Sequence, residues 1–304
     1  MKYIITGSLG HISRPVTAAL AAAGHDVTVI SSQPERIAEI ESVGASAAIG
    51  SLTDFSFVQE TFGHADAVYL MIPPNFSVED FPAYQRQVAD HYVAALRSSS
   101  VKHIVLLSSI GAHLRQGAGP IDALGYLEEQ LQSLQDRHIK ILRPAFFYYN
   151  LLGMAGLLKT AGIIGSNFGS SDEKIALVHH LDIADRVVHH LLHPHFEGYS
   201  IEYVASDERS APGIASVLGQ AAGKKNAAWV SFSDEQSYEA MVQQGLGPSL
   251  AKEYIEMGQA FREGRAQQDY WAHRPELAGS RRLEAFAGEF ARVYQAIPEP
   301  ALQA

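Results

Sequence analysis

Two glycines near the N-terminus, Gly7 and Gly10, stand where a short apolar run passes into an alanine-rich helical pattern. A glycine turn at such a junction lets the backbone approach a diphosphate closely. The helix that follows supplies free N–H groups and the positive end of its dipole. The third small position is Ser13 rather than glycine, which still permits close packing of helix on strand. An ordinary turn is the alternative, but we expect a dinucleotide here, held by Thr6, Gly7, Leu9, Gly10, His11 and Ile12.

The end of the second predicted strand bears on which nicotinamide cofactor the site prefers. An NAD-selective site places Asp or Glu there against the ribose 2′-hydroxyl, whereas this chain has Ser31, Ser32 and Gln33. Hydroxyls and cations suit a 2′-phosphate, and Arg36 and Arg14 are the candidate cations. We therefore expect NADP(H) in preference to NAD(H), with Ser31, Ser32 and Arg36 as contacts. The alternative for both arginines is a solvated surface position.

Polar residues also follow the fifth predicted strand, at Ser108 and Ser109. Ligands of parallel sheets bind outside the carboxyl ends of the strands, so Ser108 is a candidate catalytic residue. The alternative is that both serines simply end a buried strand. An aromatic run, FFYYN, lies just beyond Pro144 and fits a mostly apolar pocket. We expect a small substrate of apolar or aromatic character, although core packing is the favoured interpretation for Phe146 and Phe147.

Six of the 14 histidines lie close together, between residues 179 and 195. His189 and His193 are spaced i, i+4, which can place two zinc ligands on one helix face. No glutamate completes an H-E-x-x-H motif, and no third ligand is evident. We expect a solvated helix face and no metal.

The elements that position these residues are predicted by an alternation of apolar runs and helical patterns over the first 145 residues. Repeated strand–helix units imply a parallel sheet with right-handed crossovers, and eight units, as a (β/α)₈ barrel requires, are not found. We expect an α/β fold, a Rossmann-type doubly wound parallel sheet, over residues 1–145. Its strands are predicted at Tyr3–Thr6, Val27–Ser31, Ala47–Ile49, Ala67–Met71, His103–Leu107 and Lys140–Leu142, and its helices near 12–23, 34–43, 54–62, 80–99 and 122–136.

Residues 146–304 are expected to form a smaller, mixed, mostly helical C-terminal lobe that shapes the substrate pocket. A helix near 182–193, a strand at Ile201–Val204 and a helical tail from Glu235 to about Tyr294 are predicted. We do not expect this lobe to be independent, and some of its segments are expected to return to the sheet. The tail packs either on the Rossmann domain or on the partner of a homodimer.

The composition excludes several classes of function. A net charge of −10 opposes nucleic-acid binding, which needs Lys and Arg along phosphates. Cysteine is absent, so there is no thiolate nucleophile and no Cys-ligated metal. The N-terminus already reads as a strand, without a signal peptide, and no apolar run is long enough to cross a membrane. We expect a cytoplasmic protein.

Several motifs stand together at characteristic spacing: T-G-x-x-G from Thr6, G-S-L-T-D at 50–54, I-P-P-N at 72–75, L-L-S-S-I-G-A at 106–112, E-x-x-L from Glu128, L-R-P at 142–144 and H-L-D-I-A-D at 180–185. Over roughly residues 1–225 the chain resembles the atypical short-chain dehydrogenase/reductases of the NmrA-like NAD(P)-binding family. The resemblance implies a Rossmann domain with a substrate lobe closing over the nicotinamide. It places Asp54 and the residues before it, including Ser51 and Leu52, near the adenine. It also places Ile72 and Pro73 along the cofactor, and Ser108 near the nicotinamide ribose.

The catalytic tyrosine of that superfamily is followed four residues later by a lysine, which lowers the pKa of the tyrosine. This chain has Tyr126 on the corresponding helix, but Gln130 stands in place of the lysine. A neutral glutamine cannot lower the pKa of a phenol by charge. Tyr126 is a candidate catalytic residue, with an ordinary tyrosine on an amphipathic helix as the alternative.

Three functions follow from these observations. The first is an NADPH-dependent reductase of a small carbonyl, quinone or enone. The second is a non-catalytic, NADP-binding redox sensor or regulator, which the missing lysine favours. The third, a nucleotide-sugar epimerase or dehydratase, ordinarily needs an intact Tyr/Lys pair.

Overall fold

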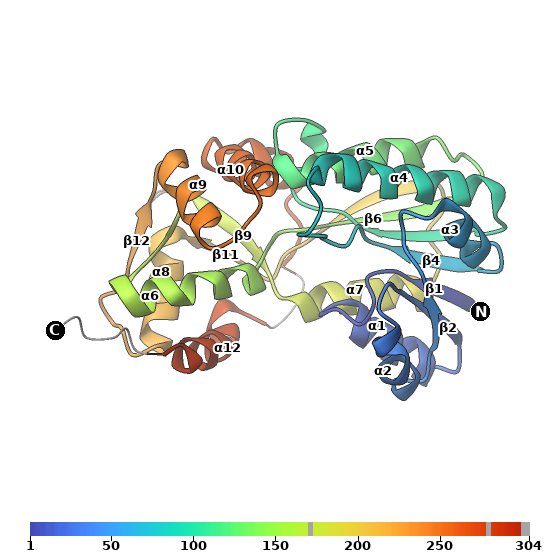
Figure 1. Ribbon diagram of the computed structural model, residues 1–304, viewed down its shortest axis with the longest axis horizontal. Helices are drawn as coiled ribbons and strands as arrows, with labels where there is room; N and C mark the ends of the chain where they lie inside the picture. Colours follow the sequence, from blue (N-terminus) through green and yellow to red (C-terminus); the bar gives the residue numbers. More distant parts are fainter. Residues whose placement is uncertain (170–172, 278–280, 299–304) are drawn as a thin grey trace.

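A computed structural model describes residues 1–169, 173–277 and 281–298. Figure 1 shows a twisted sheet with helices on both faces, beside a second, smaller part made largely of helices. Among the described residues, no helix combines the length and the apolar character that crossing a membrane requires.

The main sheet has seven strands, and every neighbouring pair is parallel. The chain starts in the middle of the sheet, proceeds to one edge and then returns to build the other side. The order therefore reverses between β1 and β4, the switch point at which such sheets bind ligands. This order confirms the predicted doubly wound Rossmann-type fold. Across the sheet the strands are β10 (Tyr199–Val204), β6 (His138–Pro144), β5 (His103–Leu107), β4 (Ala67–Leu70), β1 (Lys2–Ile5), β2 (Asp26–Ser31) and β3 (Ser46–Ile49).

Each face of the sheet is covered by its own set of helices (Figure 1). Because successive strand residues point to opposite faces, Ile4 packs in one apolar cluster and Ile5 in the other. On the Ile4 face lie α3 (Phe55–Phe62), α4 (Phe81–Ser98) and α5 (Asp122–Gln132). On the Ile5 face lie α1 (Ser13–Ala22), the 3₁₀ helix η1 (Pro34–Arg36) with α2 (Ile37–Ser42), and α7 (His180–Leu192).

Short polar side chains fix where helices of the Ile4 face begin. The carboxylate of Asp54 accepts hydrogen bonds from the backbone N–H groups of Ser56 and Phe57 at 3.0 and 3.3 Å. Asp80 accepts one from Ala83 at 2.9 Å. Such caps satisfy N–H groups that the first helical turn leaves free, so the loops before α3 and α4 have defined ends.

The second part combines small sheets with helices, as predicted for a mixed, mostly helical lobe. One sheet has the order β11-β9-β7, and a parallel pair joins β12 to β8. Its strands are β7 (Phe146–Phe147), β8 (Ile163–Ser166), β9 (Lys174–Val178), β11 (Asp207–Ser210) and β12 (Ala228–Ser231). Its helices are η4 (Tyr148–Met154), α6 (Ala155–Ala161), α8 (Ala211–Ala221), α9 (Asp234–Gln243), α10 (Pro248–Arg262), η5 (Arg265–Gln267), α11 (Gln268–Ala272) and α12 (Leu283–Ala296), while η2 (Ala112–Leu114) and η3 (Gly119–Ile121) follow β5.

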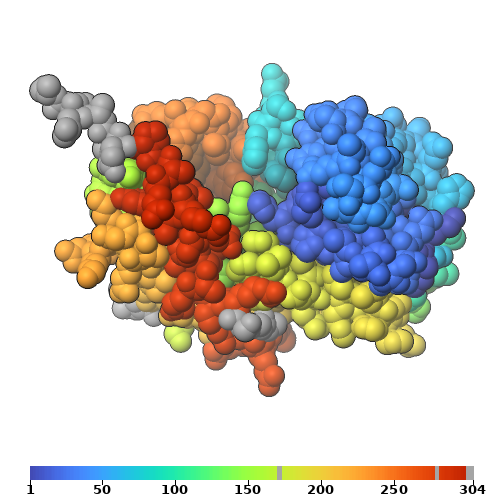
Figure 2. Space-filling view, turned by 90° about the horizontal axis from the view of Figure 1, so that it is seen from below, coloured from blue at the N-terminus to red at the C-terminus, as the bar shows by residue number. Residues whose placement is uncertain are grey.

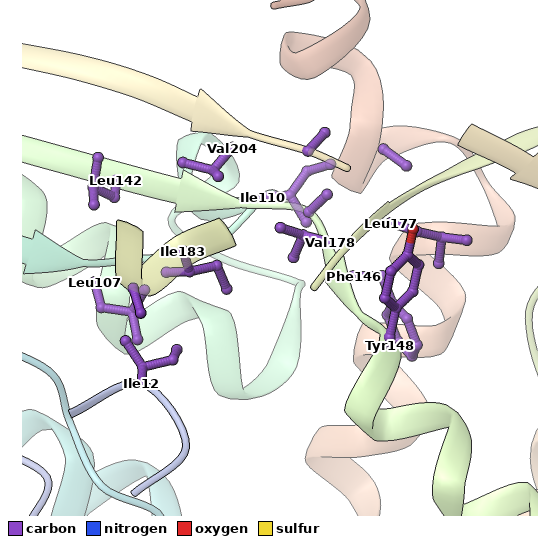
Figure 3. Close-up of a cluster of buried hydrophobic side chains, with 14 of the residues drawn as sticks. Ile12, Leu107, Ile110, Leu142, Phe146, Tyr148, Leu177, Val178, Ile183 and Val204 are labelled. Atoms are coloured by element: carbon purple, nitrogen blue, oxygen red, sulfur yellow. The ribbon is translucent and has the colours of Figure 1, made fainter. Parts of the chain in front are cut away.

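A single apolar cluster joins the two parts. Figure 3 shows it passing from Ile12 and Leu107 beside the main sheet, through Val204, to Tyr148 and Leu177 in the second part. Figure 2 shows the outside of the same region, where the segment containing α7 (yellow) lies beside the N-terminal segments (blue) and α12 (red) runs along the second part. The two parts therefore share one continuous core.

Phe286 of α12 tests this shared core. The side chain is fully buried and stacks on the ring of Tyr148 at a centroid distance of 5.4 Å. We predict that Phe286→Ala lowers the free energy of unfolding by about 3–5 kcal/mol, measured by urea denaturation. The matched control is Phe76→Ala, because the side chain of Phe76 is 63% exposed and its loss should cost less than about 0.5 kcal/mol. Equal effects of the two substitutions would contradict the shared core.

Candidate functional site

The glycine turn between β1 and α1 is built so tightly that its first glycine cannot be replaced without strain. Gly7 has φ +84°, in the left-handed region that favours glycine. A Cβ atom there would lie 2.7 Å from Sδ of Met71, which follows β4. Gly10 closes the turn by donating its N–H to the carbonyl oxygen of Gly7 at 3.2 Å. The turn therefore lies directly against the carboxyl end of β4.

Two buried hydroxyls hold this turn in place. Thr6 donates from Oγ1 to the carbonyl oxygen of Tyr69 at 3.1 Å and accepts from the N–H of Met71 at 2.8 Å. Ser13 donates from Oγ to the carbonyl oxygen of Thr6 at 3.0 Å. The serine in the third small position thus fastens α1 to β1. The side chain of Thr6, predicted as a cofactor contact, is occupied in bracing β1 against β4.

Of the remaining predicted residues of the turn, two are buried in the core and two are exposed to solvent. Leu9 and Ile12 are buried in the apolar cluster, whereas Gly10 and His11 are exposed. The ring of His11 contacts that of Tyr149 at a centroid distance of 4.1 Å. The first turn of α1 has neither a side-chain cap nor an acidic residue. Its N–H groups are therefore suited to an anion such as a diphosphate.

A cavity of about 600 Å³ extends from this turn across the ends of β2 and β3. Hydroxyls, backbone and short apolar groups dominate its wall, and the loop after β4 closes it. Such a cavity is large enough for a nucleoside. Six of the predicted cofactor contacts line it together: Gly7, Ser31, Ser32, Ser51, Leu52 and Pro73.

Ser31, at the end of β2, has a structural role in this wall. It is buried, receives a hydrogen bond from the hydroxyl of Ser8 at 3.2 Å and accepts the N–H of Gln33 at 3.2 Å. Ser32 beside it is exposed. Of the two adjacent predicted contacts, Ser32 is therefore the one whose side chain is accessible from solvent.

The two candidate cations meet on one carboxylate that the sequence analysis did not weigh, Glu39 of α2. Arg36 donates from Nη1 to Oε2 of Glu39 at 2.6 Å and from Nε to Gln33 at 3.3 Å. Arg14 forms an ion pair with Oε1 of the same carboxylate. Two guanidinium groups share one carboxylate, so this half-exposed cluster carries a net positive charge beside Ser32 and Gln33.

A second cavity, of about 250 Å³, lies where β4, β5 and β6 end. Ile72 and Ser108, both predicted, line it, and the loop after β4 separates it from the larger cavity. Its remaining wall is mostly aromatic and apolar, including Phe146, Phe147, Tyr254, Met257 and Phe261. The last three belong to α10, which was predicted from the sequence only as part of the helical tail.

Phe146 and Phe147 both belong to this wall, although core packing was the favoured interpretation. Phe146 is buried and lies 5.3 Å from the ring of Phe168 and 5.8 Å from that of Phe261, measured between centroids. It therefore serves the core and the cavity at once. Phe147 is only half-buried.

Ser108 is held by a buried ionic network. Its hydroxyl donates to Oε1 of Glu128 at 2.5 Å. Arg143 grips both carboxylate oxygens of Glu128, from Nε at 3.0 Å and from Nη2 at 2.6 Å. Arg143 also reaches Tyr203 at 3.1 Å and Asp269 at 3.0 Å. The E-x-x-L and L-R-P motifs of the sequence thus meet in one ion pair, a role that their spacing along the chain did not reveal.

Tyr126 lies elsewhere. Its hydroxyl donates to Asp90 of α4 at 2.6 Å, and the guanidinium of Arg86 lies 3.9 Å from its ring centroid. The hydrogen bond to Asp90 raises the pKa of the phenol. On α5 the buried face contains Gly125, Leu127, Glu128 and Leu131, so Tyr126 points away from the strand ends and lines neither cavity.

The histidines make pairwise contacts. The rings of His189 and His193 lie 5.5 Å apart, and His190 contacts Glu202 at 2.7 Å. Within the described ranges, no three His, Asp or Glu side chains are grouped so that they could hold a metal ion. His180 packs beside His11 of the glycine turn, where burial and the neighbouring histidines lower its pKa to about 4.

Gly7 provides a direct test of the turn, with Gly24 as a matched control. Gly24 has φ +80°, but nothing lies within 4 Å of a Cβ placed there. We predict that alanine costs about 1–2 kcal/mol of stability at either position through backbone strain. Only Gly7→Ala should also weaken NADPH binding, by about 10- to 100-fold, because a displaced turn loses a hydrogen bond to a charged diphosphate. Titration by fluorescence measures this, and equal binding by both variants would exclude the turn as the binding site.

Comparisons with known proteins agree with this geometry. A family model described as NAD(P)H-binding matches residues 7–194, from the glycine turn to the end of α7. A comparison of the sequence with curated proteins found no match.

Three solved structures illustrate the shared fold. A nucleoside-diphosphate-sugar epimerase from Staphylococcus aureus is 18% identical, with a TM-score of 0.75 over 95% of this chain and 100% of its own. The NADPH-dependent quinone oxidoreductase QOR2 of Escherichia coli, solved with NADPH, is 18% identical, with a TM-score of 0.77 over 94% and 99%. NmrA, a negative transcriptional regulator solved with NADP, is 12% identical, with a TM-score of 0.73 over 97% of each chain.

The three proteins have different functions, so the fold by itself does not choose among the functions weighed from the sequence. The expected NAD(P)-binding family is confirmed by the family model, and the chain shares its fold with NmrA and QOR2. On the match over residues 7–194, the chain belongs to the NAD(P)H-binding family.

Proposed function

We propose that this protein is an NADPH-dependent reductase of small quinone, enone or carbonyl substrates. The observation that carries the proposal is the aromatic-walled cavity of about 250 Å³ at the ends of β4, β5 and β6. A regulator that only senses the cofactor has no need of a second, apolar cavity beyond it. Mostly apolar cavities with a few polar groups are typical of small-molecule sites.

The cofactor would lie across both cavities. Its adenosine occupies the larger cavity with Ser51 and Leu52, and its diphosphate accepts hydrogen bonds from the start of α1 after Gly10. Its nicotinamide reaches the smaller cavity beside Ile72 and Ser108. When bound there, the reduced nicotinamide supplies a hydride to the substrate. The protein's own residues fix the distance and orientation between the two.

The preference for NADP(H) rests on Arg14 and Arg36. A 2′-phosphate offers several acceptor oxygens and more negative charge than the single carboxylate of Glu39, which now holds both guanidiniums. It can therefore displace that carboxylate from at least one of them. The 2′-hydroxyl of NADH is neutral and therefore forms no comparable charged interaction with Arg14 or Arg36.

Tyr254 takes the place that the sequence analysis gave to Tyr126. It lines the smaller cavity from α10, and burial raises the pKa of its phenol. It therefore keeps its proton at neutral pH and can donate it toward a substrate oxygen as hydride arrives at carbon. Without a lysine to strengthen this acid, substrates whose reduced oxygen is weakly basic suit the site best, and a hydroquinone is an example.

The cofactor preference is tested at Arg36. We predict that Arg36→Gln weakens NADPH binding by about 10- to 100-fold, the value of a hydrogen bond to a charged group. Binding of NADH should change less than about threefold, because it lacks the phosphate. Arg97→Gln, at the exposed end of α4, is the control and should bind NADPH like the unaltered protein. Parallel losses for both cofactors would refute the 2′-phosphate assignment.

Turnover is tested by NADPH oxidation with a panel of quinones, enones and aldehydes. We predict that Tyr254→Phe lowers kcat by about 100-fold, as loss of a positioned acid does. Tyr126→Phe should change kcat less than twofold, since that hydroxyl is bound to Asp90. Tight cofactor binding with no turnover of any substrate would reject the reductase and favour a redox sensor.

A further inference from the structure

Ser108 has a single hydroxyl hydrogen, which it donates in a hydrogen bond to the side chain of Glu128. The oxygen–oxygen distance is 2.5 Å, and the side chains of both residues lie in the interior, Ser108 being 3% exposed and Glu128 4%. Either partner could in principle be the donor if the carboxyl were protonated. The direction of this hydrogen bond therefore depends on the charge of Glu128.

Arg143 fixes that charge. Its guanidinium is permanently charged, is 6% exposed and meets both oxygens of Glu128 at hydrogen-bond distance. Glu128 is therefore a carboxylate, which can only accept. It follows that Ser108 donates to Glu128 and has only lone pairs left for the cavity.

The other polar groups of this cavity are less constrained. Gln85 gives one amide hydrogen to the carbonyl oxygen of Pro120 at 3.1 Å. Ser109 is half-buried and Asn150 is exposed, so water can satisfy either one. Ser108, which is 3% exposed, is the most buried of the polar side chains that line this cavity, and a ligand atom that fails to pair with it leaves a buried acceptor unsatisfied.

We propose that the smaller cavity selects aromatic ligands that donate a hydrogen bond, through a hydroxyl or an N–H group, to Oγ of Ser108. The inference rests on the proposed function and narrows its substrate class to hydroxylated or amino-substituted aromatic carbonyls and quinones, whose second polar group is a donor. Ser108 positions such a ligand by accepting a hydrogen bond from it. Because the hydroxyl hydrogen of Ser108 is already donated to Glu128, Ser108 does not polarise a substrate carbonyl. Its two lone pairs allow a cofactor hydroxyl to occupy one while the ligand takes the other.

The test compares two ligands of nearly the same shape, 2-naphthol and 2-methoxynaphthalene, by isothermal titration with and without saturating NADP⁺. Only the first can donate a hydrogen bond. We expect naphthol to bind about tenfold more tightly, the value of one neutral hydrogen bond with a buried acceptor. Ser108→Ala should abolish this preference, and Ser108→Thr, which keeps the hydroxyl, should restore it. Ser109→Ala is the matched control and should leave the preference intact.

Equal affinities in the unaltered protein, or a preference that survives Ser108→Ala, would overturn the inference. The result is separable from the proposed function. If NADP⁺ fails to bind while the Ser108-dependent preference appears in the free protein, the reductase is refuted and the donor-selective cavity stands. If NADP⁺ binds and no preference appears, the cavity inference alone is wrong.

Discussion

The buried ion pair between Glu128 and Arg143 connects elements from both parts of the molecule. The ion pair links α5 to β6, and Ser108 at the end of β5 donates a hydrogen bond to Glu128. Arg143 also donates hydrogen bonds to Tyr203 of β10 and Asp269 of α11. Two charges removed from water are costly unless each finds its partners, and removing one partner from such a pair typically costs about 3–5 kcal/mol. The network is satisfied only when the main sheet, α5 and the C-terminal helices are all in place. The position of Ser108 at the cavity is therefore a consequence of the assembled fold.

The two halves of the site have different origins. The larger cavity is formed by the carboxyl ends of β1, β2, β3 and β4, which the parallel sheet brings to one edge. The wall of the smaller cavity comes largely from beyond residue 145, from Phe146, Phe147 and α10. One fold is found in an epimerase, a quinone oxidoreductase and a regulator, so function depends on the residues that line the cavities rather than on the fold.

Much of this architecture was predictable from the sequence, because it depends on local pattern. The strands from β1 to β6 coincide with the predicted apolar runs, since strands buried on both faces must be continuously apolar. What could not be predicted depends on partners distant in the chain. No strand is predicted at Asp207–Ser210, yet this polar segment forms β11 by pairing antiparallel with β9, and its buried Glu208 is paired with Arg274 at 2.6 Å.

The site shows the same division. Glycine spacing located the turn, and the predicted serines after β2 and β5 line the larger and the smaller cavity, respectively. The prediction for Tyr126 followed a family motif, whereas helical geometry turns Glu128 toward the strand ends and Tyr126 toward Asp90. Tyr254 and Glu39 carry no sequence signal, because nothing local indicates that α10 packs on η3 beside the smaller cavity or that Glu39 meets two arginines.

The central claim is that a nicotinamide dinucleotide lies across the glycine turn and spans both cavities. A crystal structure of the protein soaked with NADPH tests it most directly. We expect the diphosphate at the N–H groups that begin α1, the 2′-phosphate between Arg14 and Arg36, and the nicotinamide within contact of Ser108. A cofactor bound in the opposite direction, or one that leaves the smaller cavity untouched, would contradict it.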